Sequence, residues 1–203
     1  MAKNQKGKFI VLYGCNNLGK TTQAKLLVEN LMIKFNRNAE YLKFAIYNLE
    51  PTGPLINSYL RQGNPYQFSA REFQLLQVLN RTQYEPKLEE KLSKGTWVVA
   101  EDYEGTGIAW GMVSGVNKEL LYKLNSHLLK EDLGILFQGE PFPENLDKNN
   151  VHEVNLATLE KANQAFAEIA RDFGWHIINA KQSIEAVQEQ ILDIIKRKIT
   201  IIE

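Results

Sequence analysis

The sequence has little of several features that mark common classes of protein. It contains a single cysteine, Cys15, in 203 residues, which excludes an internal disulfide. Its three histidines, at positions 127, 152 and 176, lack the spacing of a structural metal site. No apolar run approaches the roughly 20 residues of a membrane-spanning helix, and the N-terminus has no apolar signal core. We therefore expect a cytoplasmic protein that does not contact membranes.

Neither basic nor acidic residues are in excess. The chain has 24 basic and 24 acidic side chains, so its formal net charge is zero and we expect no nucleic-acid partner. Only six of the basic residues are arginines: Arg37, Arg61, Arg71, Arg81, Arg171 and Arg197. This scarcity limits how many guanidinium groups could contact a phosphate.

A phosphate-binding pattern near the start is the clearest motif that is present. Residues 14–21 match G-x-x-x-x-G-K-[ST], with an apolar strand-like run before them and a helix-forming segment after them. Gly14 and Gly19 allow backbone N–H groups to point at phosphate oxygens. Lys20 supplies a charge to the β- and γ-phosphates, and the Thr21 hydroxyl can bind Mg²⁺.

Segments of strand and helix character alternate along the whole chain. The predicted strands are 9–13, 40–47, 96–100, 133–137 and 175–179, and the main predicted helices are 21–35, 54–60, 69–94, 107–129, 156–173 and 183–199. Ser69 and Glu72 form a capping box, and we expect Pro86 to kink or divide the helix that they begin. The alternation predicts a three-layer α/β/α sandwich with about five parallel strands and helices on both faces.

The domain organisation follows from the same pattern. No linker or internal repeat interrupts residues 1–203, so we expect one domain. The stretch 139–155 is polar, has no apolar period and contains Pro141 and Pro143. Long loops of this kind in compact domains often carry function, and we expect a lid here.

Three polar clusters follow predicted strands, where ligands bind in open α/β sheets. They are the loop at 14–21, the turn at 49–53 and the segment 101–103, and Arg81 comes from the long helix between the last two. A nucleotide kinase needs this layout, with a donor triphosphate on the first loop and an acceptor opposite.

The ordered set of motifs resembles the thymidylate kinases, within the P-loop nucleoside monophosphate kinase group. The resemblance covers about residues 8–199. It is carried by residues 9–23, Glu50-Pro51-Thr52-Gly53, Asn80-Arg81, the stretch 101–110 and the closing segment 173–185. The P-loop is the most specific of these pieces.

The resemblance implies a transferase that moves the γ-phosphoryl group of ATP to a nucleoside monophosphate, dTMP foremost, in dTTP biosynthesis. The implied catalytic residues are Lys20, Glu101 and Arg81, and the implied Mg²⁺ ligands are Thr21 and Glu101. The implied ATP-binding residues are Gly14, Cys15, Asn16, Asn17, Leu18, Gly19, Lys20, Thr21 and Thr22. The implied acceptor-binding residues are Glu50, Phe73, Gln77, Arg81, Asp102 and Tyr103. A homodimer is implied as well.

Several positions depart from the family pattern. Asp102 stands where the family has an arginine, Asn16 where it has an aspartate, and Gln77 where it has a stacking phenylalanine, with Phe73 one further turn back. The expected lid has no arginine, although Arg61, Arg71 and Arg81 could compensate on the acceptor side. Two alternatives therefore stay open: a deoxynucleoside kinase with Glu50 as base, and a nucleotide-binding protein with weakened catalysis.

Overall fold

A central parallel sheet organises the fold in the computed structural model, which describes residues 6–140 and 156–199. The strands are β1 (Phe9–Tyr13), β2 (Ala39–Lys43), β3 (Trp97–Glu101), β4 (Leu133–Gln138) and β5 (His176–Asn179). Their order across the sheet is β2-β3-β1-β4-β5, and the paired strands are all parallel. The prediction of a five-stranded parallel sheet is confirmed.

The strands β1 and β3 are buried along their whole length. Continuous apolar runs such as residues 9–13 form such strands because both faces of a parallel sheet are covered by helices. In the register, Leu12 lies opposite Glu101, and Glu101 lies opposite Lys43. The carboxyl ends of the first three strands therefore meet at one edge.

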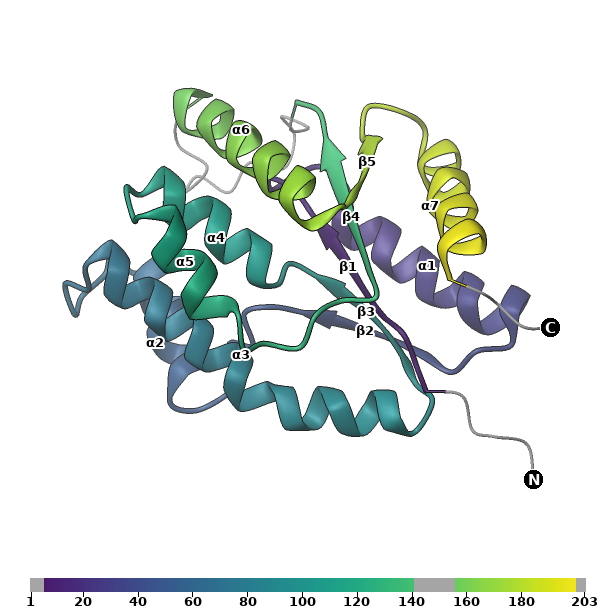
Figure 1. Cartoon of the computed structure of the whole chain (residues 1–203), viewed down its shortest axis with the longest axis horizontal. Coiled ribbons are helices and arrows are strands. Elements are labelled where there is room, and N and C mark those ends of the chain that lie inside the picture. Colours follow the sequence, from purple (N-terminus) through teal and green to yellow (C-terminus); the bar gives the residue numbers. More distant parts are fainter. Residues whose placement is uncertain (1–5, 141–155, 200–203) are drawn as a thin grey trace.

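Helices cover both faces of the sheet (Figure 1). They are α1 (Lys20–Phe35), α2 (Thr52–Arg61), α3 (Ala70–Ser93), α4 (Glu104–Val113), α5 (Lys118–Asn125), α6 (Leu156–Phe173) and α7 (Ile184–Lys198). Helices α1 and α7 lie together on one side, and α3, α4, α5 and α6 lie on the other (Figure 1). This arrangement confirms the predicted α/β/α layers.

The long helix α3 begins with the predicted capping box, since Ser69 Oγ accepts from the backbone N–H of Glu72 and Glu72 accepts from that of Ser69. Of the two effects predicted for Pro86, division of the helix is wrong, because α3 runs unbroken through it, and a kink stays a prediction. Pro86 removes only one backbone donor, and Tyr84 and Leu88 anchor the helix in the core on either side of it.

The predicted helix 107–129 is instead two helices. Helix α4 ends at Val113, and Gly115 adopts a φ of +81° before α5 begins. Such a left-handed backbone favours glycine and ends a helix. Strand β2 is also shorter than predicted, ending at Lys43.

No helix within residues 6–140 and 156–199 is long and apolar enough to cross a membrane. The expected lid, at about 139–155, lies almost wholly outside the described residues.

Candidate active site

A cleft of about 700 Å³ opens at the carboxyl ends of β1, β2 and β3. It brings together eleven of the residues predicted for the site: Asn16, Asn17, Leu18, Gly19, Lys20, Thr21, Thr22, Gln77, Arg81, Glu101 and Asp102. The P-loop and helix α3 thus face one space, an arrangement that would suit a reaction between two bound ligands.

The P-loop has the backbone that its sequence pattern predicts. Gly14 and Gly19 have φ angles of +132° and +78°, and a Cβ on Gly14 would lie 2.6 Å from the Phe137 carbonyl oxygen. The loop therefore passes too close to β4 for any side chain at this position. Helix α1 begins at Lys20, so its N-terminal N–H groups and dipole favour an anion here.

Lys20 is buried inside the loop. Its Nζ donates to the carbonyl oxygens of Gly14 (2.9 Å) and Cys15 (2.7 Å), and it lies 3.9 Å from Asp102 Oδ1. These contacts place the ammonium where the loop's N–H groups can share an anion with it. The side chain is thus positioned in advance of any ligand.

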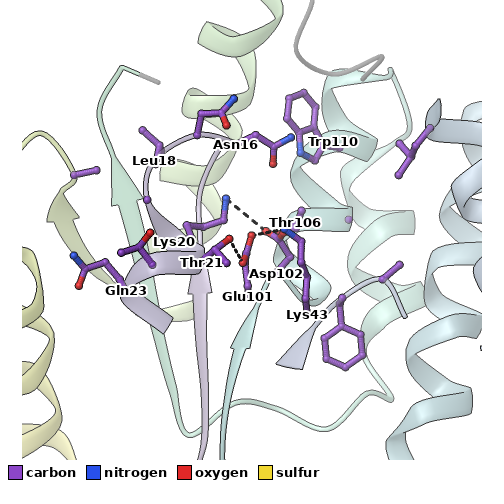
Figure 2. A pocket seen from close by; sticks show the side chains of 18 of the residues that line it. Asn16, Leu18, Lys20, Thr21, Gln23, Lys43, Glu101, Asp102, Thr106 and Trp110 are labelled. Carbon is purple, nitrogen blue, oxygen red and sulfur yellow. Dashed lines mark hydrogen bonds and ion pairs between the residues drawn. The ribbon is translucent and has the colours of Figure 1, made fainter. Parts of the chain in front are cut away.

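Glu101 is the centre of the polar network on the cleft floor (Figure 2). Its Oε2 accepts from Thr21 Oγ1 (2.6 Å) and Tyr41 Oη (2.8 Å), and its Oε1 accepts from Lys43 Nζ (2.6 Å). Burial raises the pKa of this carboxyl, but Lys20, Lys43 and the hydrogen bonds outweigh it, so its pKa lies below the ordinary value. The group is an anion at neutral pH.

Asp102 follows with a left-handed backbone, φ +63°. Its Oδ1 accepts from Thr106 Oγ1 at 3.0 Å, which ties it to the first turn of α4. Burial raises the pKa of this carboxyl, and Glu101 adds to the effect, while Lys20 opposes it. An acidic group therefore lies beside the P-loop lysine, at a position where the family resemblance implies a guanidinium.

Arg81 enters the cleft from α3 and is almost fully buried. Its Nη2 donates to Gln77 Oε1 at 3.3 Å. Its Nε and Nη1 are buried and have no hydrogen-bond partner within the described part of the chain. A buried guanidinium with unused donors is suited to a ligand with acceptor oxygens.

The residues present fit a magnesium ion. Thr21 Oγ1 and Glu101 Oε2 converge to 2.6 Å, and hydroxyl and carboxylate oxygens are ligands that Mg²⁺ accepts. No cluster of three or more His, Cys, Asp or Glu residues exists in the ranges that the structure covers. This donor set matches an ion bound largely by nucleotide phosphates and water.

Five predicted site residues do not line the cleft. Gly14 and Cys15 belong to the P-loop but do not line the cleft; the Cys15 thiol donates to Asn163, and burial raises its pKa to about 11. Phe73 stacks on Tyr59 in a small second core. The remaining two are Tyr103, which is buried against aromatic rings of the main core, and Glu50, whose side chain is exposed.

The cleft also contains residues that sequence reasoning missed. Lys43, Gln74 and Trp110 line it without having been predicted. Lys43 could have been found, since it ends β2 and polar groups at strand ends belong to such sites. Of the two arginines expected to compensate beside Arg81, Arg61 lines the cleft, with its guanidinium 4.7 Å from the Tyr47 ring centre, whereas Arg71 does not.

Comparisons with known proteins agree with this geometry. A family model described as "Thymidylate kinase" matches residues 12–191. The human thymidylate kinase is 32% identical over 92% of this chain and 89% of its own length, and that of Plasmodium falciparum is 30% identical over 93% and 89%.

Solved structures show the same fold. A thymidylate kinase structure from Candida albicans superposes with a TM-score of 0.79 at 24% identity, covering 95% of this chain and 92% of that one. The likeness to curated relatives extends over nearly the whole chain, as does the match to the family model. The chain therefore belongs to the thymidylate kinase family.

Proposed function

We propose that this protein transfers the γ-phosphoryl group of ATP to dTMP, giving dTDP and ADP. The observation that carries this proposal is the shared cleft, with the buried Lys20 of the P-loop on one side and the buried, partly unpaired Arg81 on the other. Phosphoryl transfer needs little more than two phosphates held in line among positive charges. Family membership supports the choice of dTMP.

The chain's own groups divide the work between donor and acceptor. Lys20 would bind the β- and γ-phosphates of ATP, together with the backbone N–H groups at the start of α1. Thr21 and Glu101 would hold Mg²⁺, which supplies charge neutralisation when bound. Their present hydrogen bond, 2.6 Å long, supports this assignment because it holds the two oxygens together.

Lys43 would supply a cation that the family pattern places on arginine. Its Nζ lies 2.6 Å from Glu101, its side chain is 45% exposed, and it lines the cleft. Although burial lowers the pKa of this amine, Glu101 and Asp102 raise it above the ordinary value, so Lys43 remains charged. A flexible, charged stem beside the metal site could reach the acceptor phosphate.

We expect Lys43→Met to lower kcat for dTMP about tenfold, because one of the few cations in the cleft is lost. Lys43→Arg should recover most of the activity. Steady-state ADP release measures both. The matched control is Lys94→Met. Lys94 follows the last residue of α3, is exposed and pairs with Glu90 at the surface, so this variant should behave like the wild type. Unchanged kcat in Lys43→Met would remove this residue from the mechanism.

We also propose that residues 1–203 form one catalytic domain with a lid near 139–155. On the same ground of family membership, we propose that the protein is cytoplasmic, binds nucleotides rather than nucleic acid, and forms a homodimer. Helix α3 supports the dimer, since Leu75 and Leu79, one turn apart, are 46% and 49% exposed. Static light scattering of the wild type and Leu79→Glu tests this assembly.

A screen of ADP release against all common nucleoside and deoxynucleoside monophosphates, and thymidine, tests the proposed function. Turnover with dTMP is expected. A chain that turns over thymidine but not dTMP would be a deoxynucleoside kinase. The exposed Glu50, which that activity would need as base, does not line the cleft, so nothing in the site favours it. Tight ATP binding without any turnover would contradict the proposal.

A further inference from the structure

Two polar side chains of α3 fit against two glycines of α4. Gln74 and Arg81 are two helical turns apart on α3, and Gly107 and Gly111 are one turn apart on α4. A Cβ on Gly107 would lie 2.8 Å from Arg81 Nη2, and one on Gly111 would lie 2.7 Å from Leu121 Cδ2 and 3.1 Å from Gln74 Cδ. Gly107 thus makes room for the guanidinium, and Gly111 makes room for Leu121 and lets the Gln74 carboxamide pack closely against α4.

Both side chains keep unused hydrogen-bonding groups. Gln74 is 2% exposed, and its Oε1 is buried without a partner among residues 6–140 and 156–199. Arg81 likewise has Nε and Nη1 unpaired there. An unpaired buried polar group is unfavourable, because it has lost its hydrogen bonds to water. No contact among the described residues compensates for these atoms, but both residues line the cleft, where a ligand could pair with them.

The chemistry of the pair defines what it can recognise. A guanidinium can only donate, so the ligand atom facing Arg81 must be an acceptor. The Gln74 carboxamide can turn to present either its oxygen or its NH₂. When the Gln74 oxygen faces the ligand, Arg81 can pair with an acceptor on the ligand and Gln74 can pair with a neighbouring donor.

Resting on the proposed function, we propose that Gln74 determines base specificity by accepting the ring N3–H of the acceptor base while Arg81 donates to its 4-oxo group. Thymine and uracil carry this edge. Guanine has the same pair on a larger ring system, but the proposed function restricts the base to a pyrimidine. Trp110, between the two glycines on α4, also lines the cleft (Figure 2).

Cytosine is the base that the pair rejects. It carries an amino group at position 4 and an unprotonated nitrogen at position 3. Turning Gln74 around would satisfy the ring nitrogen, but the amino group would still face the donors of Arg81. A site built on buried hydrogen bonds rejects a mismatched analogue strongly, because its own groups are then left unpaired.

The test compares wild type with Gln74→Met, which keeps the length of the side chain and removes its hydrogen bonds. We expect kcat/KM for dTMP and dUMP to fall about 30-fold and the preference for dTMP over dCMP to shrink by a similar factor. Calorimetric titration of dTMP should show the same loss of affinity without chemistry. The proposal fails if Gln74→Met keeps both the dTMP kinetics and the preference over dCMP.

Two controls keep folding and recognition apart. Gln188→Met replaces another buried glutamine with unpaired amide atoms in the described chain, outside the cleft wall, and should leave the kinetics unchanged. The melting temperature of ligand-free Gln74→Met should not fall, because the buried carboxamide oxygen that the substitution removes has no partner among the described residues. A fall of several degrees with an unchanged dTMP-to-dCMP ratio would make Gln74 a structural residue.

A modified ligand gives a second, independent readout. N3-methyl-dTMP lacks the ring N–H, so wild type should bind it at least 30-fold more weakly than dTMP, while Gln74→Ala should narrow this difference. Equal discrimination by both proteins would overturn the proposal. If wild type instead turned over no thymidine nucleotide at all, the proposed function itself would fail, and that result is distinct from every outcome in which only Gln74 proves irrelevant.

Discussion

Lys20→Ala should lower kcat for dTMP phosphorylation by about 10³-fold, the scale seen when a charge that stabilises phosphoryl transfer is removed. Lys20 is 3% exposed, and its ammonium is held by the Gly14 and Cys15 carbonyl oxygens inside the loop. It is thus positioned before ATP arrives, and no other cation of the described P-loop could replace it. Coupled ADP release under saturating ATP measures the effect.

Two further variants make this experiment specific. Lys25→Ala removes an exposed lysine from the same helix and should leave kcat unchanged. Lys20→Arg keeps the charge but cannot place a planar guanidinium between two carbonyl oxygens, so we expect little recovery. A Lys20→Ala protein that is folded by circular dichroism and retains more than a tenth of the activity would contradict the role of Lys20.

The P-loop could be predicted from sequence because its chemistry is local. Its two glycines, its lysine and its threonine lie within eight residues, and the strand and helix around them follow from simple hydrophobic patterns. The same holds for the capping box of Ser69 and Glu72, whose partners are three residues apart. Such features depend on backbone geometry that the chain determines over one or two turns.

The acceptor side could not be predicted as well, because it depends on which segments come together in space. Lys43 meets Glu101 only through the register of β2 and β3, and Gln74 meets the cleft only through the packing of α3 on α4. Glu50 and Tyr103 matched family motifs, yet one side chain is exposed and the other lies in the core. A motif match fixes position along the chain and leaves the direction of the side chain open.

The cleft also shows how the chain compensates for its few arginines. Within the described residues its cationic side chains are Lys20, Lys43, Arg61 and Arg81, each from a different element or loop. Asp102 lies 3.9 Å from Lys20 and cancels part of that charge. In the proposed mechanism the balance of charge around the transferred group therefore depends on the metal ion and on Lys43, more than it would in an arginine-rich site.

The second large expected effect is a change in the free energy of unfolding with pH, caused by the carboxyl of Glu104. Glu104, at the start of α4, is fully buried; one carboxylate oxygen pairs with Lys130 at 2.5 Å, and Oε1 has no partner in the described structure. Burial raises the pKa of this carboxyl to about 7, and Lys130 only partly opposes the effect. The folded chain thus keeps a proton that the unfolded chain releases near pH 4.5.

The direction in which stability changes with pH follows from the state, folded or unfolded, that holds the Glu104 proton more tightly. Between about pH 4.5 and 7 the folded state binds more protons at Glu104 than the unfolded state, so this group makes the free energy of unfolding fall as pH rises. The difference between the two pKa values amounts to about 3 kcal/mol when complete. Glu131, nearby and also with a pKa raised by burial, acts in the same direction.

Glu104→Gln should therefore stabilise the protein by about 3 kcal/mol at pH 8 relative to its effect at pH 4.5, because the amide has no charge to desolvate. Urea unfolding from pH 4.5 to 8 measures the difference between variant and wild type, which cancels the titration of most other groups. Glu90→Gln, at an exposed carboxylate whose pKa Lys94 lowers, should show no such rise above pH 5. A flat difference for Glu104→Gln would mean that the buried carboxyl titrates like one in water, and that its burial is offset by Lys130 and Arg81 together.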